Sequence, residues 1–180
     1  MGNPLASRGA LIFLAVLGLA VAGQASAAPA RPTKPVDLIR YFGRWYEIAR
    51  VPNQFENGAG CQAPTADYNQ NPKGQISVIQ TCHKGSPVGA EVIYRAAGHI
   101  VDPGVNARLK LTYFILMSKE YWVLDYARDY QWAIVGDSTG RFLWLLSRSP
   151  NVTEGTRADM LQRARALGYD IAQLEFPAQK

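Results

Sequence analysis

Three features of this sequence could take part in chemistry: two cysteines, two histidines, and a serine in a glycine-bounded motif. Cys61 and Cys82 could form a disulfide, or one of them could act as a nucleophilic thiol. The histidines, His83 and His99, lack the spacing of metal ligands and are predicted to be surface or rim residues. The sequence therefore predicts no metal site and no cofactor.

The serine belongs to residues 136–140, Gly-Asp-Ser-Thr-Gly, which match the G-x-S-x-G pattern of hydrolases. In those enzymes the serine lies on a sharp turn between a strand and a helix, with histidine and acid partners. Here the motif separates two apolar segments, 131–136 and 142–147, that are typical of strands. We interpret it as a hairpin turn and predict no catalytic residue.

The two cysteines flank a strong turn signal, Asn-Gln-Asn-Pro-Lys-Gly at residues 69–74. If the hairpin is centred between Asn71 and Pro72, facing residues have numbers that sum to 143, and Cys61 faces Cys82. Directly opposed residues are close enough for a disulfide, which an oxidising compartment favours. The alternative is two free thiols, one of them reactive, which would favour an enzyme.

The N-terminal segment predicts export. Arg8 precedes a run of 13 apolar residues, 10–22, and Ala-Ser-Ala at 25–27 fits a cleavage site for a secretory signal peptide. The run is shorter than the ~20 apolar residues of a spanning helix. Gln24 stands where a bacterial lipoprotein box carries its lipidated cysteine. We therefore predict a periplasmic or outer-membrane-associated protein, with Gln24 arguing against a lipid anchor.

The rest of the chain has the size of one domain. We predict a signal peptide at 1–27, a Pro/Ala linker at 28–36 and a single domain at 37–180. The formal net charge of +5 is spread along the chain without a dense Lys/Arg cluster, so the sequence does not predict nucleic-acid binding.

The domain reads as short apolar segments separated by turn signals, after one helical turn at 37–42. Predicted strands lie near 43–52, 61–68, 75–82, 90–100, 107–114, 121–126, 131–136 and 142–147. A flat eight-stranded sheet would expose its edges, and closure into a barrel removes them. The predicted fold is all-β, an eight-stranded antiparallel up-and-down β-barrel.

One α-helix is predicted after the barrel, with Thr153 as its N-cap and Gly168 as its terminator. Its apolar face is predicted to pack on the outside of the barrel, and a short final strand is predicted at 171–176.

Alternation of apolar and polar residues predicts which side chains face the barrel interior. An eight-stranded barrel holds side chains or one small ligand. The candidate cavity residues are Tyr68, Val92, Tyr94, Leu109, Leu111 and Tyr113. Such a lining is apolar with a few phenols, and suits an acyl chain with a polar head near the mouth.

Three ordered motifs resemble the signatures of lipocalins, most of all bacterial outer-membrane lipocalins and apolipoprotein D. They are residues 37–50, which contain Gly43-Arg44-Trp45, residues 121–137, and residues 143–150, which contain Arg148. In this family the eighth strand pairs with the first, so the resemblance implies that Arg148 lies over Trp45. Gly43, Trp45 and Arg148 are therefore expected to be structural, with Trp45 sealing one end of the barrel.

The resemblance also implies a function. It implies storage or transport of a hydrophobic small molecule, a fatty acid or lysophospholipid, in the cell envelope for membrane maintenance. Peripheral membrane contact and a monomer or homodimer are compatible with this. Two alternatives stay open: an isomerase or hydrolase on a lipocalin barrel that uses a free cysteine, and an envelope scaffold that binds no ligand.

Overall fold

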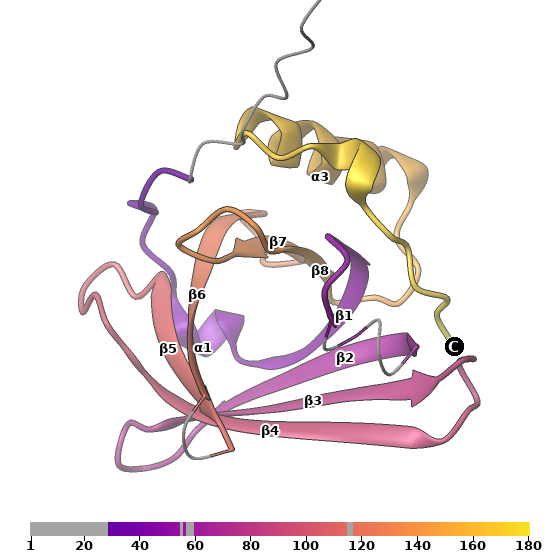
Figure 1. The fold of residues 1–180 in the computed structure, drawn as a ribbon. Helices are drawn as coiled ribbons and strands as arrows, with labels where there is room; N and C mark the ends of the chain where they lie inside the picture. The colour runs from indigo at the N-terminus through magenta and orange to yellow at the C-terminus, as the bar shows by residue number, and fades with distance from the viewer. Residues whose placement is uncertain (1–28, 55, 57–59, 115–116) are drawn as a thin grey trace, which may run out of the picture.

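The computed structural model describes residues 29–54, 56, 60–114 and 117–180. The predicted signal peptide, 1–27, lies outside these ranges. The described chain forms a closed barrel in which every strand is antiparallel to its neighbours and β8 pairs with β1 (Figure 1). The strands are β1 (Gly43–Arg50), β2 (Cys61–Gln70), β3 (Ile76–Lys84), β4 (Glu91–Ile100), β5 (Arg108–Tyr113), β6 (Met117–Tyr126), β7 (Trp132–Gly136) and β8 (Leu143–Ser147). The predicted fold class is confirmed.

Two hydrophobic clusters hold the fold together. One fills the barrel around Trp45 and the buried side chains of β5, whereas Lys110 of β5 is exposed, as alternation predicts. The other lies between the barrel wall and helix α3 (Glu154–Ala166), which buries Met160 and Ala164 (Figure 1). Thr153 caps α3 by accepting a hydrogen bond from the Thr156 amide, 3.2 Å away.

The cysteine hairpin forms, but its predicted register was wrong. Tyr68 faces Val78, and Cys61 faces Lys84 rather than Cys82. The ladder is interrupted between Gln62 and Thr65 by a β-bulge, which re-aims the start of β2. The predicted disulfide between Cys61 and Cys82 is present, across a diagonal with Cα atoms 5.2 Å apart.

The predicted final strand at 171–176 was also wrong. Asp170 accepts a hydrogen bond from the Ala172 amide, and the chain forms a 3₁₀ turn, η1 (Ile171–Gln173). Only Glu175 then pairs in a ladder, as an isolated bridge to Arg50. Pro177 has no amide hydrogen and cannot extend the pairing.

The C-terminal segment instead fills the gap where β1 and β2 separate. Regular pairing of these strands ends at Tyr46 and Thr65. Beyond this point the Ala63 backbone amide donates to the Ala178 carbonyl at 2.6 Å, and the Gln179 side-chain amide donates to the Glu47 carbonyl at 2.8 Å. The tail therefore satisfies backbone groups that the diverging strands leave unpaired.

The last residues of the predicted linker contact the barrel. The Lys34 ammonium lies 2.8 Å from Asp125, and the Val36 amide donates to the Val105 carbonyl at 2.7 Å. The short helix α1 (Leu38–Tyr41) follows, capped by the Asp37 side chain. The boundaries at 27/28 and 36/37 stay predictions.

Candidate functional site

Trp45 and Arg148 close one end of the barrel, where α1 crosses it. The Trp45 side chain is completely buried, and its indole N–H donates to the Tyr41 carbonyl at 2.8 Å. The Arg148 guanidinium lies over the indole ring, 3.6 Å from its centroid, which is a cation–π contact. Gly43 has a φ of +97°, a conformation that other residues rarely adopt, so it lets the chain turn from α1 into β1.

Arg148 also ties α1 to β1 through backbone carbonyls. Its Nη1 donates to the Arg44 carbonyl at 2.7 Å, and its Nη2 lies 2.6 Å from the Arg40 carbonyl and 3.0 Å from that of Tyr41. Burial lowers the pKa of Arg148, and the nearby Tyr41 opposes the shift only in part. These contacts hold α1 across this end of the barrel, and the structural role of Gly43, Trp45 and Arg148 stays a prediction.

A cavity opens at the opposite end, among the loops that join β1 to β2, β5 to β6 and β7 to β8. Four of the predicted cavity residues line it, namely Tyr68, Tyr94, Leu111 and Tyr113. Leu109 is buried deeper in the core, and Val92 shares its strand face with Tyr94 but does not reach the cavity. Whether any of these residues touches a ligand stays a prediction.

The cavity is larger than the space of a single water molecule. The space open to the centre of a water molecule is about 130 Å³. A cavity needs only ~10–15 Å³ of occupied volume to hold one water molecule, so this cavity has room for more than one. Phenol groups add polar points to the wall: the Tyr113 hydroxyl donates to Gln80 at 2.9 Å, and burial raises the pKa of Tyr113 to about 12.

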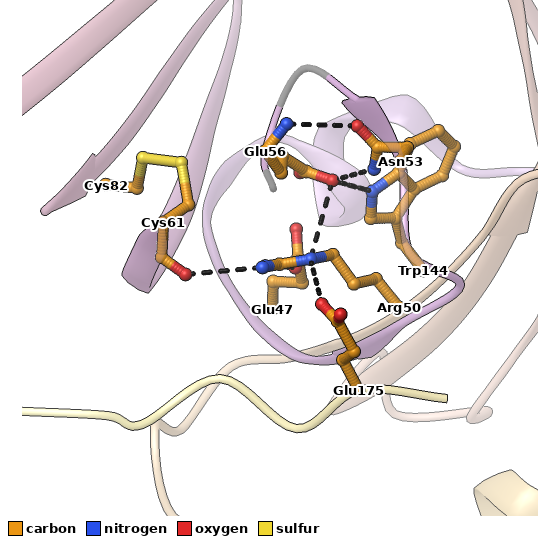
Figure 2. The surroundings of a disulfide bond; sticks show 8 residues. All are labelled: Glu47, Arg50, Asn53, Glu56, Cys61, Cys82, Trp144 and Glu175. Atoms are coloured by element: carbon orange, nitrogen blue, oxygen red, sulfur yellow. Dashed lines mark hydrogen bonds and ion pairs between the residues drawn. A yellow bond between two sulfur atoms is a disulfide. The ribbon is translucent and has the colours of Figure 1, made fainter. Parts of the chain in front are cut away.

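A charged cluster borders this cavity, and the sequence analysis did not find it. The Arg50 guanidinium lies 2.7 Å from Glu47, 3.7 Å from Glu56 and 3.4 Å from Glu175 (Figure 2). Glu47 and Glu56 line the cavity. Arg50 is 3% exposed and Glu47 is 7% exposed, so both charges are withdrawn from water.

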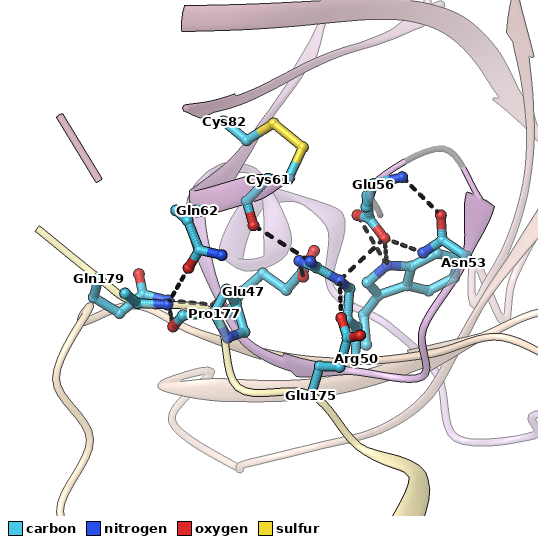
Figure 3. A network of polar contacts seen from close by, with 12 residues as sticks. Glu47, Arg50, Asn53, Glu56, Cys61, Gln62, Cys82, Glu175, Pro177 and Gln179 are labelled. Carbon is cyan, nitrogen blue, oxygen red and sulfur yellow. Dashed lines mark hydrogen bonds and ion pairs between the residues drawn. A yellow bond between two sulfur atoms is a disulfide. The ribbon is translucent and has the colours of Figure 1, made fainter. Parts of the chain in front are cut away.

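Neighbouring polar groups hold the cluster in place. The Trp144 indole N–H points at the Glu56 carboxylate, 3.3 Å from one oxygen, and Asn53 donates to the same group (Figure 2). Arg50 Nη2 donates to the Cys61 carbonyl at 3.3 Å, which connects the cluster to the disulfide-bonded strand. On the outer side, Gln179 of the C-terminal segment bonds the backbone of Glu47 (Figure 3).

The Glu47 carboxyl group is a weaker acid here than an ordinary glutamate side chain. Burial raises its pKa well above the ordinary value of 4.5, and the nearby Glu56 raises it further, while Arg50 opposes the shift. A carboxyl group with a strongly raised pKa is a functional-site candidate when it faces a cavity. Here it marks a wall that already carries excess negative charge.

A β-bulge explains why the sequence did not reveal this cluster. The pairing of β1 with β8 shifts between Glu47 and Ala49. Because a one-residue shift exchanges the two faces of a strand, Ala49 packs in the cluster beneath α3 and Arg50 lies on the side of Glu47. Two oppositely charged residues three positions apart, Glu47 and Arg50, were the available signal.

The remaining reactive candidates have structural positions. Residues 137–140 form the hairpin turn between β7 and β8, as predicted. His99 is exposed, but His83 is buried, which corrects its predicted surface position; its Nε2 lies 3.0 Å from the Lys180 ammonium. Both cysteines form the disulfide, so neither supplies a free thiol.

Two features are absent from the part of the chain that the structure describes. No group of three or more His, Cys, Asp or Glu residues there is placed to hold a metal ion. In the same ranges, no helix is long and apolar enough to cross a membrane.

Comparisons with known proteins agree with this geometry. A family model described as a lipocalin-like domain matches residues 36–179. The chain is 33% identical over 149 residues to temperature-induced lipocalin-1 of Arabidopsis thaliana, with 78% of each chain covered. It is 30% identical over 168 residues to the outer membrane lipoprotein Blc of Escherichia coli K12, covering 91% of this chain and 92% of the relative.

A solved structure shows the same fold. The structure of insecticyanin from the tobacco hornworm Manduca sexta matches with a TM-score of 0.65 at 20% identity, covering 86% of each chain. The barrel, the Trp45–Arg148 closure and the match over residues 36–179 together confirm the resemblance found in the three sequence motifs. The chain belongs to the lipocalin family.

Proposed function

We propose that this lipocalin buries the acyl chain of a fatty acid or lysophospholipid in its barrel, and that it stores or transports this ligand in the cell envelope for membrane maintenance. The open cavity, with Leu111 and Leu146 in its wall and aromatic side chains around its mouth, carries this proposal. The relative in Escherichia coli is an outer membrane lipoprotein, which supports an envelope location. Gln24 still argues against a lipid anchor in this chain.

Burial of the chain supplies the affinity. Each buried methylene contributes ~0.8 kcal/mol, so about twelve give roughly 10 kcal/mol before the costs of association. After an association cost of at least ~4 kcal/mol, about 6 kcal/mol remains, which corresponds to a dissociation constant of tens of micromolar. Affinity should therefore rise with chain length until the cavity is full.

The direct test is titration with alkyl maltosides of increasing chain length, because their head group is neutral. We expect the affinity to rise about fourfold per methylene, the equivalent of ~0.8 kcal/mol, and then to level off. Native mass spectrometry of protein purified from its own envelope would identify the bound ligand. Absence of lipid together with no binding in titration would contradict the proposal and favour the scaffold alternative.

A matched pair of variants locates the binding. Ala66 lines the cavity, whereas Ala97 of β4 is exposed on the outer face of the barrel. Ala66→Phe should fill the cavity and weaken binding of the longer chains, and Ala97→Phe should leave binding unchanged. Circular dichroism of both variants would verify the fold, since overpacking costs ~1–3 kcal/mol. Equal affinities in the two variants would place the ligand outside the barrel.

The cavity rim is suited to contact with a membrane surface. Phe114 is 70% exposed and Met117 is 39% exposed, and both lie at the mouth and line the cavity. Exposed apolar residues beside a lipid cavity would let a ligand pass between bilayer and barrel with little contact with water. Co-sedimentation with phospholipid vesicles should fall for Phe114→Ser, and unchanged co-sedimentation would contradict the proposed contact.

A further inference from the structure

Most of the ionisable side chains in the cavity wall are acidic. Among the described residues that line it, four carry carboxyl groups and Lys119 alone carries a cationic group. The Lys119 ammonium lies over the Phe142 ring, 4.7 Å from its centroid. Glu120 is bound to the Trp122 indole N–H, and Asp137 accepts the Phe142 amide within the turn. Glu47 and Glu56 are the second pair of carboxyl groups in the wall, and they lie beside Arg50.

Arg50 does not neutralise this wall. Its single guanidinium is shared among Glu47, Glu56 and Glu175, at 2.7, 3.7 and 3.4 Å. Glu175 lies on the C-terminal segment and does not line the cavity, so part of the positive charge is directed away from the ligand space. Three carboxyl groups against one guanidinium leave an excess of negative charge even when Glu47 holds a proton.

A second observation indicates how a ligand head would be received. The Trp144 ring lies beside Glu56, with its indole nitrogen 3.3 Å from the carboxylate. Its centroid is 6.3 Å from that of Tyr121 and 5.9 Å from that of Phe142, so the three rings form an aromatic wall. A carboxylate beside an aromatic face attracts a cationic nitrogen by both charge and cation–π interaction.

An anionic head would meet the opposite response. Glu56 already raises the pKa of Glu47, so a carboxylate placed in this wall is pushed towards its neutral form. A fatty-acid carboxylate in the same place would experience the same repulsion. It would have to bind protonated or to keep its head outside, near Lys119.

We propose that the cavity selects amphiphiles whose head carries a cationic nitrogen, an ammonium or quaternary ammonium seated beside Glu56 and against the aromatic wall, over amphiphiles with a carboxylate head. This inference rests on the proposed function, because it names the head group of the ligand whose chain the barrel buries. The same nitrogen occurs in a simple alkylamine and in the choline or ethanolamine head of a lysophospholipid. It narrows the two expected ligand classes towards the lysophospholipid.

The test uses four ligands with the same dodecyl chain below their micelle concentrations: dodecyltrimethylammonium, dodecylphosphocholine, dodecyl maltoside and dodecanoate. We expect both ligands with a quaternary nitrogen to bind at least tenfold more tightly than dodecanoate, a difference of ~1.4 kcal/mol that a desolvated cation–π contact can supply. The neutral maltoside should lie between them.

The possible results separate this inference from the function on which it rests. Dodecanoate binding as tightly as the cationic ligands would overturn the head-group preference while leaving the acyl-chain proposal intact. Binding of dodecylphosphocholine without dodecyltrimethylammonium would show that the phosphate is recognised, and would also overturn it. Failure of all four ligands, the neutral maltoside included, would refute the proposed function and this inference together.

A matched pair of variants assigns the effect to Glu56. Glu56→Gln keeps the size of the side chain and removes its charge, and should weaken dodecyltrimethylammonium about tenfold while leaving dodecyl maltoside unchanged. Glu154→Gln makes the same charge change at the exposed start of α3 and should alter neither affinity. Equal losses in both variants, or an equal loss of maltoside in Glu56→Gln, would contradict a specific contact.

Discussion

Arg148 offers the sharpest test of the closed end, because one side chain there makes both the cation–π contact and the carbonyl contacts. In Arg148→Ala, the carbonyls of Arg44, Arg40 and Tyr41 lose a charged donor, and the Trp45 ring loses the guanidinium 3.6 Å from its centroid. The five N–H groups of a guanidinium form a fixed fork, which a lysine ammonium cannot reproduce.

The magnitude follows from these contacts. Arg148 is half-buried, so we assign each of about three carbonyl hydrogen bonds ~1 kcal/mol, below the ~1.5–3 kcal/mol of a fully buried charged bond. The cation–π contact adds ~0.5–1 kcal/mol. The free energy of unfolding should therefore fall by ~3–4 kcal/mol, and the melting temperature by about 10 °C for a domain of this size.

Urea and thermal unfolding measure this loss, and maltoside titration at a temperature where the variant is folded measures binding. We expect the loss of stability with an unchanged affinity, because the closure and the cavity lie at opposite ends of the barrel. Arg148→Lys should lose about half as much, and Arg141→Ala, an exposed change in the β7–β8 turn, should lose nothing. Stability within ~1 kcal/mol of the unmodified protein, or reduced affinity with intact stability, would refute this structural assignment.

Two further predictions concern the disulfide and pH. Replacing Cys61 and Cys82 by serine should lower the free energy of unfolding by ~3 kcal/mol, because the bond spans 21 residues of sequence, and urea unfolding with and without reductant measures this. The pKa of Glu47 is raised above 4.5 in the folded protein, so above pH 4.5 the folded protein binds more protons than the unfolded chain. The contribution of Glu47 to stability therefore falls as the pH rises towards the folded-state pKa. In Glu47→Gln, the free energy of unfolding should fall less steeply with rising pH, by up to ~1.4 kcal/mol per pH unit. An unchanged slope would contradict the raised pKa of Glu47.

The closed end was predictable from sequence because barrel closure constrains it. Trp45 lies in the first strand and Arg148 directly follows the last, and an up-and-down barrel must bring those strands together. Their contact therefore depends on topology and not on a local detail such as the shape of one turn. The number of strands and the position of α3 were predictable for a different reason, because apolar patterns in the sequence indicate them.

The cysteine hairpin shows how a correct pairing can follow from a wrong register. The Asn71 side chain accepts hydrogen bonds from the Lys73 and Gln75 amides, at 3.0 and 2.9 Å, and so builds a longer turn than the one expected. Its centre moves beyond Pro72, and the facing positions move with it. The bulge near Ala63 then brings Cys61 back within reach of Cys82, an outcome that no pattern of apolar residues specifies.

The two ends of the barrel treat a guanidinium in opposite ways, and this contrast indicates where selection for function acts. At the closed end, Arg148 meets neutral carbonyls and an indole, and burial without a carboxylate partner lowers its pKa. At the open end, Arg50 is buried among three carboxyl groups, and such a cluster rarely repays the cost of withdrawing its charges from water. Apolar residues at Glu47 and Arg50 would complete the barrel core more simply. A cluster that departs from the rules of core packing beside an open cavity is best explained by what it does for a ligand there, which is the expectation that Glu56→Gln tests.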